Sequence, residues 1–222
     1  MNKIIYEDNH ILVVEKPSNM PVQGDSSGDL DLLTSLKKYI KDKYNKPGNV
    51  YLGLVHRLDR PVGGVMVFAR TSKAAERLSK DIVNNEVDKY YLAVVCGTLT
   101  DKKGIMEDYL LKDEKTNTTR VDSSGKYAKL EYEVLAEKDG FSLVKIHLIT
   151  GRSHQIRVQF ASRNLPLWGD KKYNNKSLAG EQIALWSWEL SFNHPTTKER
   201  LTFKSYPKYE YPWNLYNINN YS

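Results

Sequence analysis

Residues 54–71 constrain this chain more than any other stretch, because a charged loop runs directly into an apolar segment. The apolar segment, residues 65–69, is rich in β-branched and aromatic side chains, which indicates a short buried strand. Residues 61–64 precede it as a turn, and residues 56–60 supply the charges. Binding and catalytic residues concentrate on loops that a rigid element carries, so this loop is the first candidate for a functional site.

Asp59 is the candidate for chemistry in this loop. Arg57 and Arg60 flank it, and in an extended segment Arg57 and Asp59 point to the same face. A neighbouring guanidinium favours the ionised carboxylate, so Asp59 suits a nucleophile or an electrostatic partner better than a proton donor. An Asp between arginines is also the ordinary composition of an exposed ion pair of little energetic value. The charges alone leave both interpretations open.

The composition is that of a globular protein of ordinary size. The chain has 222 residues, a formal net charge of +6 and 40% hydrophobic residues, and its excess of positive charge suits a polyanionic partner. Cys96 is the only cysteine, which excludes an internal disulfide and a thiolate metal site and favours a reducing, cytoplasmic setting. Acidic residues precede any long apolar run, and no run approaches the ~20 residues of a membrane helix, so we expect neither a signal peptide nor a membrane span.

Apolar periodicity predicts two helices. In residues 32–43 apolar side chains recur at helical spacing, and Asp31 is placed to cap the helix. A second helix is expected over residues 73–84, with Ser72 as its cap.

Alternation predicts an antiparallel sheet. Residues 128–136 and 141–149 alternate between apolar and polar side chains, which places one face on a core and one in water. Residues 148–163 fit a strand or a helix, and periodicity does not decide between them. Further strands are expected over residues 3–6, 10–14, 87–97, 104–111 and 117–121.

The string His-Arg-Leu-Asp-Arg, then a turn, then Gly-Val-Met-Val-Phe-Ala-Arg-Thr resembles the RluA-type pseudouridine synthases. In that family the Asp is catalytic, so the resemblance assigns catalysis to Asp59. The chain departs from the family at Val62 and Gly63, where a pair of hydroxyl residues is expected to brace the loop. Arg57, beside the nucleophile, is expected to fill the stack that a flipped base vacates or to hold the flipped nucleotide.

Two further segments resemble the same family. Lys16-Pro17 is similar to its first motif, so Lys16 is expected to face RNA, although a Lys before a Pro is otherwise a solvated side chain. Tyr90 and Tyr91 must point to opposite faces of a strand. The family pattern of Lys, any residue, Tyr, any residue, Ala selects Tyr91, with Lys89 as an RNA contact. The resemblance makes Tyr91 the ring that packs against the target uracil, whereas the segment alone would suggest a core tyrosine.

The string Thr-Gly-Arg-Ser-His-Gln-Ile-Arg-Val, which begins at Thr150, resembles the third motif of the family. There the second arginine pairs with the catalytic carboxylate, which makes Arg157 the partner of Asp59. A buried carboxylate without a cation would be costly, so such a pair would keep the nucleophile charged. Gln159 stands where the family usually has a His.

The same segment carries a cationic cluster. Arg152 and His154 are expected to contact RNA together with Arg60, although such a cluster is most often a solvated face. The family has a helix here, and Ser153 is placed to begin it. Residues 166–173 resemble the Gly-Asp and Tyr that follow the motif in the family.

The resemblance covers nearly the whole chain and implies an α+β fold, a mixed, mainly antiparallel sheet flanked by helices. We expect one catalytic domain over residues 1–222, with residues 206–222 as a tail. Many members carry a small RNA-binding domain ahead of the catalytic one, and this chain is expected to be a short member that begins at the first catalytic strand.

The implied reaction converts a uridine of ribosomal or transfer RNA to pseudouridine. It needs no cofactor and no metal, and we expect a cytoplasmic monomer that binds RNA and no membrane. The base must leave its stack to be reached, and lysines and arginines would supply a salt-dependent attraction to the RNA backbone. Two alternatives remain at this point, namely a non-catalytic RNA-binding or assembly protein on the same fold, and a nucleoside glycosidase that releases free uracil.

Overall fold

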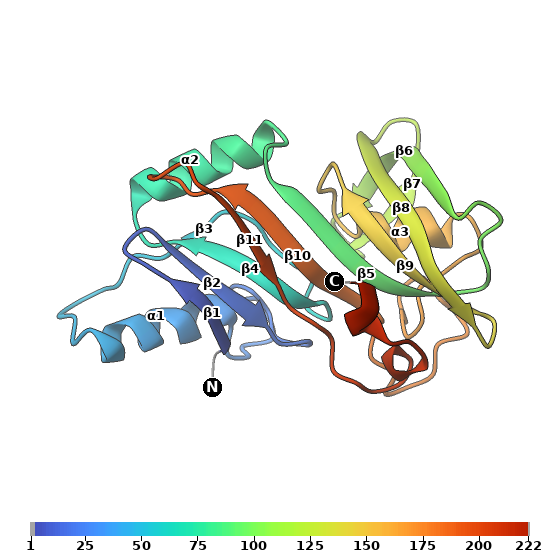
Figure 1. The fold of residues 1–222 in the computed structure, drawn as a ribbon, viewed down its shortest axis with the longest axis horizontal. Coiled ribbons are helices and arrows are strands. Elements are labelled where there is room, and N and C mark those ends of the chain that lie inside the picture. The colour runs from blue at the N-terminus through green and yellow to red at the C-terminus, as the bar shows by residue number, and fades with distance from the viewer. Residues whose placement is uncertain (1–2, 222) are drawn as a thin grey trace. The chain divides into compact units, whose positions relative to one another are not determined.

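The structure is a computed structural model that describes residues 3–221. The chain packs into two compact units (Figure 1). The first comprises the described residues up to Asp88 together with Ser187–Ser205, and the second comprises Lys89–Trp186 and the described residues from Tyr206 onward. That residues 1–222 act as one catalytic domain stays a prediction.

The first unit is built on a sheet in the order β1, β2, β4, β10. In β4 all seven residues are buried, so both faces of this strand are covered. Strand β2 runs antiparallel to β4, with Lys16 opposite Gly64. The strands of this unit are β1 (Lys3–Glu7), β2 (Ile11–Lys16), β3 (Gly53–Leu54), which pairs with β4, β4 (Gly63–Ala69), β10 (Leu185–Asn193) and β11 (Arg200–Lys204), which pairs with β10.

Two helices complete the first unit. Helix α1 (Leu32–Lys43) is capped by Asp31, whose side chain accepts a hydrogen bond from the Thr34 N–H, as the sequence predicts. Helix α2 (Ser72–Val83) is capped by Thr71 and not by the predicted Ser72, because Thr71 has the extended backbone and its hydroxyl accepts the Ala74 N–H. Leu78 of α2 packs with buried apolar residues of β2, β4 and β10.

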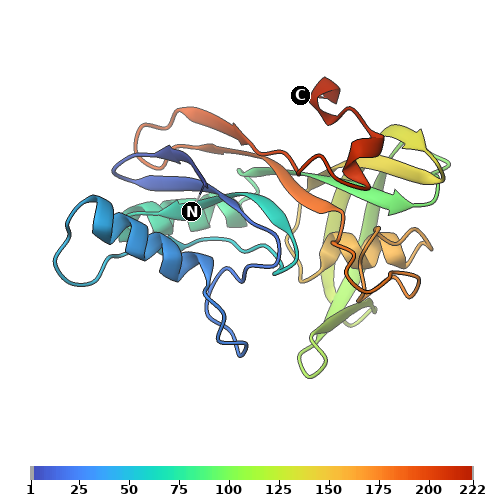
Figure 2. The same cartoon turned by 90° about the horizontal axis from the view of Figure 1, so that it is seen from below.

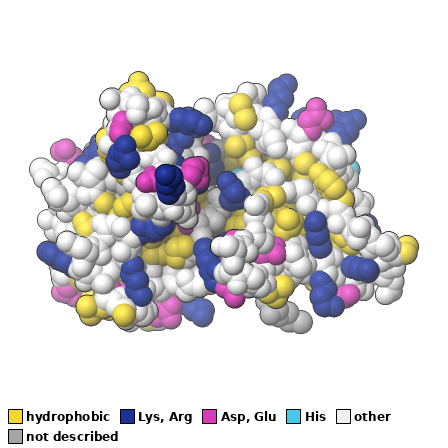
Figure 3. All heavy atoms as spheres, turned by 180° about the vertical axis from the view of Figure 1, so that it is seen from behind, with side chains coloured by type: hydrophobic (Ala, Val, Ile, Leu, Met, Phe, Trp, Pro, Cys, Tyr) yellow, Lys and Arg dark blue, Asp and Glu magenta, His cyan; other side chains and the backbone are white. Residues whose placement is uncertain are grey.

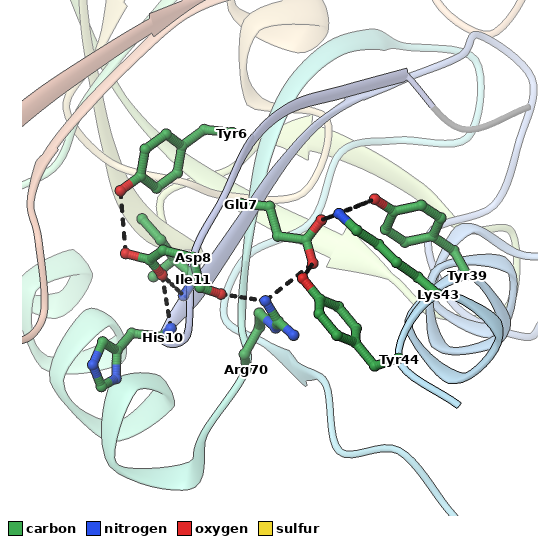
Figure 4. A network of polar contacts seen from close by, with 9 residues as sticks. All are labelled: Tyr6, Glu7, Asp8, His10, Ile11, Tyr39, Lys43, Tyr44 and Arg70. Carbon is green, nitrogen blue, oxygen red and sulfur yellow. Dashed lines mark hydrogen bonds and ion pairs between the residues drawn. The ribbon is translucent and has the colours of Figure 1, made fainter. Parts of the chain in front are cut away.

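A cluster around Glu7 fixes the far end of β4. The Glu7 carboxylate accepts hydrogen bonds from Lys43 at 2.7 Å and from the hydroxyls of Tyr39 and Tyr44, and Arg70 approaches it at 3.0 Å (Figure 4). Arg70 also donates to the main-chain carbonyl of Asp8. Since Arg70 directly follows β4, this network joins that strand to β1 and to α1.

The second unit is an antiparallel sheet in the order β5, β9, β8, β6, β7. Its strands are β5 (Asp88–Cys96), β6 (Lys103–Asp113), β7 (Thr118–Val121), β8 (Lys126–Lys138) and β9 (Phe141–Leu148). The ambiguous segment folds as helix α3 (Gln155–Ala161), which lies beside β6 and β7 (Figure 2). Val158 of α3 packs on Leu110 and Ala128. Because residues 155–160 are all buried, a helix covered on every side does not show a simple apolar stripe.

The C-terminal segment packs on the second unit. The Tyr211 ring meets Trp168 edge-on at 5.3 Å and Phe141 at 6.4 Å between ring centroids. Trp213 and Tyr216 are buried behind it. The segment contains two short 3-10 helices, η1 (Trp213–Leu215) and η2 (Ile218–Tyr221).

The described residues thus form an α+β protein, as predicted, with helices packed on antiparallel strands. None of the helices in residues 3–221 has the length and apolarity needed to cross a membrane. On the face drawn in Figure 3, Lys and Arg side chains are interspersed with Asp and Glu and do not gather in one patch.

Candidate active site

Asp59 lies in a tight turn just ahead of β4. The Val62 N–H donates to the Asp59 carbonyl at 3.0 Å and closes the turn. Leu58 and Val62 are buried on either side, whereas Asp59 itself is half-buried and Arg57 is exposed. Two apolar anchors therefore hold a loop whose charged side chains reach the surface.

A single buried lysine braces this turn. Lys16 is fully buried, and its Nζ donates to the carbonyls of Val62 at 2.7 Å, Arg60 at 2.9 Å and Pro17 at 2.9 Å. The ammonium thus points at the backbone of the Asp59 loop and not at solvent. This geometry corrects the prediction that Lys16 faces RNA, because a side chain enclosed in this way has a structural role. Lys16 also braces the loop in which Val62 and Gly63 replace the hydroxyl residues expected to brace it.

The surroundings of Lys16 shift its pKa in opposite directions. Burial lowers the pKa of Lys16, the Asp59 carboxylate raises it in part, Arg60 lowers it further, and the pKa that results is about 7. The three carbonyl acceptors match the three N–H groups of an ammonium, an arrangement that favours the charged form. Lys16 therefore lies close enough to Asp59 for the two charges to influence each other.

Gly64 has no room for a side chain. Its φ is +124°, and a Cβ there would lie 2.2 Å from the carbonyl oxygen of Ser187. The Ser187 hydroxyl also donates to the Val65 carbonyl at 3.0 Å. The loop thus joins β4 at a point where the chain touches β10 backbone to backbone.

The side chain of Arg60 is held by an exposed loop. Its guanidinium donates to the Ser27 hydroxyl at 2.9 Å, pairs with Asp29, and lies 3.6 Å from Asp25. These side chains are 41–55% exposed, so the ion pairs are worth little individually. The Asp25 and Asp29 carboxylates therefore pair with Arg60, which we expect from the sequence to contact RNA. The contact of Arg60 with RNA stays a prediction.

The two tyrosines of β5 point to opposite faces. Tyr91, opposite Ile146 of β9, is only 7% exposed. Tyr90 stacks on His147 with 4.5 Å between ring centroids, and Lys145 lies 4.9 Å from the Tyr90 ring. The structure thus places Tyr91 on the covered face of its sheet, while the predicted contact of Tyr91 with a uracil stays a prediction. Lys89, the other residue predicted in this strand, is half-buried.

Arg157 is held from two sides within the second unit. Asp170, 1% exposed, accepts from Nε at 2.8 Å and from Nη2 at 2.7 Å of the guanidinium. The Tyr173 ring lies 5.1 Å from the guanidinium carbon. Asp170 also accepts the Lys172 N–H, so its charge is well satisfied. The side chain is therefore oriented before any substrate is present.

Sequence reasoning gave Asp170 and Tyr173 no role. Both lie in the segment that resembles the Gly-Asp and Tyr of the family, but the resemblance alone gave them no function. A signal was available, because a buried arginine needs a carboxylate, and Asp170 follows Arg157 by 13 residues, just after the apolar residues 166–168.

His154 and Arg152 lie at the start of α3. His154 occupies the N-cap position with φ 52° and makes no capping hydrogen bond, so the helix begins one residue later than predicted from Ser153. Its Nδ1 lies 2.7 Å from the Tyr173 hydroxyl. Arg152 is exposed and donates through Nε to the Tyr127 carbonyl.

Gln159 ties α3 to β6. The side-chain amide is fully buried and donates to the Met106 carbonyl at 3.2 Å and to Asp108 at 2.8 Å. Arg163 pairs with the same Asp108 carboxylate at 2.9 Å. The departure from the family at position 159 therefore lies in a packing contact of the helix. Among the residues described, no group of three or more His, Cys, Asp or Glu side chains is placed to hold a metal ion.

The sequence matches known proteins over most of its length. A family model described as RNA pseudouridylate synthase matches residues 10–162. An "Uncharacterized RNA pseudouridine synthase" of Aquifex aeolicus is 37% identical over 218 residues, which cover 90% of this chain and 68% of that protein. The "Uncharacterized RNA pseudouridine synthase YlyB" of Bacillus subtilis is 35% identical, covering 91% and 68%. The "Ribosomal large subunit pseudouridine synthase C" of Vibrio vulnificus is 30% identical, covering 88% and 62%.

Solved structures share the fold. Human RNA Pseudouridylate Synthase Domain Containing 4 superposes with a TM-score of 0.79 at 22% identity, over 93% of this chain and 89% of that one. Human RNA Pseudouridylate Synthase Domain Containing 1 superposes with a TM-score of 0.76 at 23% identity, over 94% of this chain and 84% of that one.

Proposed function

Because this chain belongs to the RNA pseudouridylate synthase family, a family of isomerases, we propose that it converts a uridine of an RNA to pseudouridine. The bond between N1 of uracil and the ribose breaks, the base turns while it is held, and C5 joins the ribose. N1 gains the proton that C5 loses, so the reaction is balanced without an oxidant, a metal or a second substrate. The match over residues 10–162, which includes Asp59, Tyr91 and Arg157, is the observation that carries the proposal.

Asp59 is the catalytic carboxylate of this proposal. It acts either as a nucleophile on the sugar or base, or as the group that assists cleavage of the glycosidic bond. The turn closed by Val62 and braced by Lys16 supports this role, because a catalytic group must keep one geometry through the reaction.

Arg157 is the proposed partner of Asp59, and Tyr91 is the proposed ring against the uracil. Asp170 uses the Nε and Nη2 side of the guanidinium, and a guanidinium has five N–H donors, so the geometry allows Arg157 to bind a second carboxylate. An aromatic ring such as that of Tyr91 is of the kind that stacks on bases.

The RNA contacts of the proposal come from exposed and half-buried cations. Arg57 takes the place of the flipped base, at a cost of a few kcal/mol for unstacking. Arg60, Lys89, Arg152 and His154 contact the RNA around it. The substrate is a ribosomal or transfer RNA, and ribosomal RNA is favoured because several relatives are named for the large ribosomal subunit. We place the enzyme in the cytoplasm as a monomer.

The test is to incubate purified protein with RNA and to map pseudouridines by carbodiimide-blocked reverse transcription. Asp59→Asn should slow formation by at least about a thousandfold while RNA binding persists. Asp42→Asn is a matched control, since Asp42 is exposed and pairs with Lys38 on the surface of α1. Mapping in cells with and without the gene identifies the modified uridine.

Two outcomes would contradict this proposal. RNA binding by the wild-type protein without any pseudouridine would favour the binding-protein alternative. Release of free uracil, detected by chromatography of the reaction, would favour a glycosidase that cleaves without rejoining.

A further inference from the structure

Tyr173 connects three elements of the second unit. Its hydroxyl accepts the Thr119 N–H of β7 at 2.8 Å and lies 2.7 Å from Nδ1 of His154. Its ring lies 5.1 Å from the guanidinium carbon of Arg157 and edge-on to the His154 ring, with 5.6 Å between ring centroids. The Tyr173 side chain therefore contacts both Arg157, the proposed partner of Asp59, and His154, a proposed RNA contact.

The hydrogen bonds of Tyr173 favour one position for the His154 proton. A phenol oxygen that accepts the Thr119 N–H has its own proton left to donate, and Nδ1 of His154 is in reach. Burial raises the pKa of Tyr173, so the hydroxyl keeps that proton at neutral pH. In the tautomer in which Nδ1 accepts this proton, the imidazole is neutral and carries its hydrogen on Nε2.

The backbone of His154 is also constrained. A φ of 52° lies in the left-handed region, which is uncommon for residues other than Gly, although His is among those enriched there. Such conformations cost roughly 1–3 kcal/mol and persist where surrounding contacts enforce them, often at functional sites. His154 is only half-buried, and the exposed Arg152 precedes it by two residues, so its surroundings suit an anion.

We propose that Tyr173 is a positioning residue that orients Arg157 through its ring and fixes His154 through its hydroxyl, so that His154 donates its Nε2–H to a backbone phosphate of the RNA substrate. The inference rests on the proposed function for the identity of the substrate. A neutral N–H donor binds a phosphate through a directed hydrogen bond and releases no counterion from the RNA. The charged Arg152 does release a counterion, so the salt dependence of binding distinguishes the two residues.

The first test needs no RNA and no activity. Long-range proton–nitrogen NMR spectra of the free protein at pH 7.5 report the tautomer of each of its five histidines, and His154→Gln identifies the His154 signals by their absence. We expect wild-type His154 to carry hydrogen on Nε2 alone. Tyr173→Phe should give a mixture of tautomers, whereas Tyr127→Phe, which loses a hydrogen bond to Glu107 in the same unit, should leave the His154 signals unchanged. Hydrogen on Nδ1 in the wild-type protein, or an unchanged tautomer in Tyr173→Phe, would overturn the proposal.

The second test measures how the variants bind and convert the RNA substrate. Tyr173→Phe keeps the ring below Arg157, so KM should rise about three- to tenfold while kcat changes less than twofold, and Tyr173→Leu should lower kcat as well. His154→Ala should weaken binding without changing the slope of log affinity against log salt, whereas Arg152→Ala should reduce that slope by about 0.7–0.9. A reduced slope for His154→Ala would show a charged contact and contradict the assignment. If the protein made no pseudouridine at all, the proposed function would fail while the NMR result still stood.

Discussion

Lys16 and Arg157 are both buried cations, and the protein satisfies them in different ways. Lys16 of the first unit donates to three backbone carbonyls, whereas Arg157 of the second unit forms a bidentate pair with Asp170. Carbonyl dipoles fix the direction of an ammonium but do not cancel its charge, while a carboxylate does both. The stability that Lys16 gives to the Asp59 loop should therefore depend on pH. The start of α3 should instead be destabilised when Arg157 loses Asp170.

The largest effect is expected from Asp170→Leu. It leaves the Arg157 charge buried without its carboxylate and should lower the free energy of unfolding by about 3–5 kcal/mol, measured by urea denaturation. The double variant Arg157→Met with Asp170→Leu should recover most of that loss without recovering activity. Glu133→Gln is the control, because its pair with Lys103 is exposed and should be worth under about 1 kcal/mol. A loss for Asp170→Leu no larger than that of the control would remove the distinction between the two units.

Lys16→Met should have a smaller effect on stability. It leaves three carbonyls without their donor, but it also removes a buried charge, so the net loss should be about 1–3 kcal/mol. Pseudouridine formation should fall much more than stability, because the turn that carries Asp59 loses its brace. If the rate falls only in proportion to the unfolded fraction, Lys16 has no role beyond packing.

The stability difference between wild type and Lys16→Met should depend on pH. In the unfolded chain Lys16 has the ordinary lysine pKa of 10.5, and in the folded protein burial lowers the pKa to about 7. Between these values the unfolded state binds the proton and the folded state does not, so wild-type stability should rise with pH relative to the variant, by up to about 1.4 kcal/mol per pH unit. Below pH 7 the difference should be flat. A flat difference from pH 6.5 to pH 9 would show that the three carbonyls keep the ammonium charged.

The sequence predicted α1 with its cap and nearly all strands because these depend on neighbours in the chain. The cap of α2 was missed by one residue, since Thr71 and Ser72 are chemically equivalent and only the backbone at Thr71 distinguishes them. Helix α3 could not be told from a strand, because burial on all sides removes the periodic signal.

The site was predicted less completely than the fold. The resemblance to a family identified Asp59, Tyr91 and Arg157 as candidates. It did not predict the contacts that hold the Asp59 loop and Arg157 in place. Lys16 was expected at the surface because its burial depends on β4, which follows it by about fifty residues. Asp170 and Tyr173 were unassigned because their partners on α3 and β7 are set by tertiary structure.

The smallest effect is expected at the exposed cation of the same loop. Asp25→Asn with Asp29→Asn removes both carboxylates from Arg60 and should change stability by less than about 1 kcal/mol. RNA should bind a few-fold more tightly at low salt, because a phosphate then no longer competes with the two carboxylates for Arg60. The control Asp42→Asn with Glu76→Gln removes the same charge elsewhere, so an equal gain in both variants would assign the effect to net charge and not to Arg60.

The contact of Gly64 with Ser187 has a consequence for the order in which the protein matures. Ser187 donates to Val65 across 122 positions of sequence, and the whole second unit up to Trp186 is translated between them. A nascent chain therefore carries its Asp59 loop without the strand that completes it until Ser187, 122 positions beyond Val65, has been made. The Asp59 loop gains its final setting only after β10 has been made, so a polypeptide that stops before Ser187 should lack the proposed activity toward RNA.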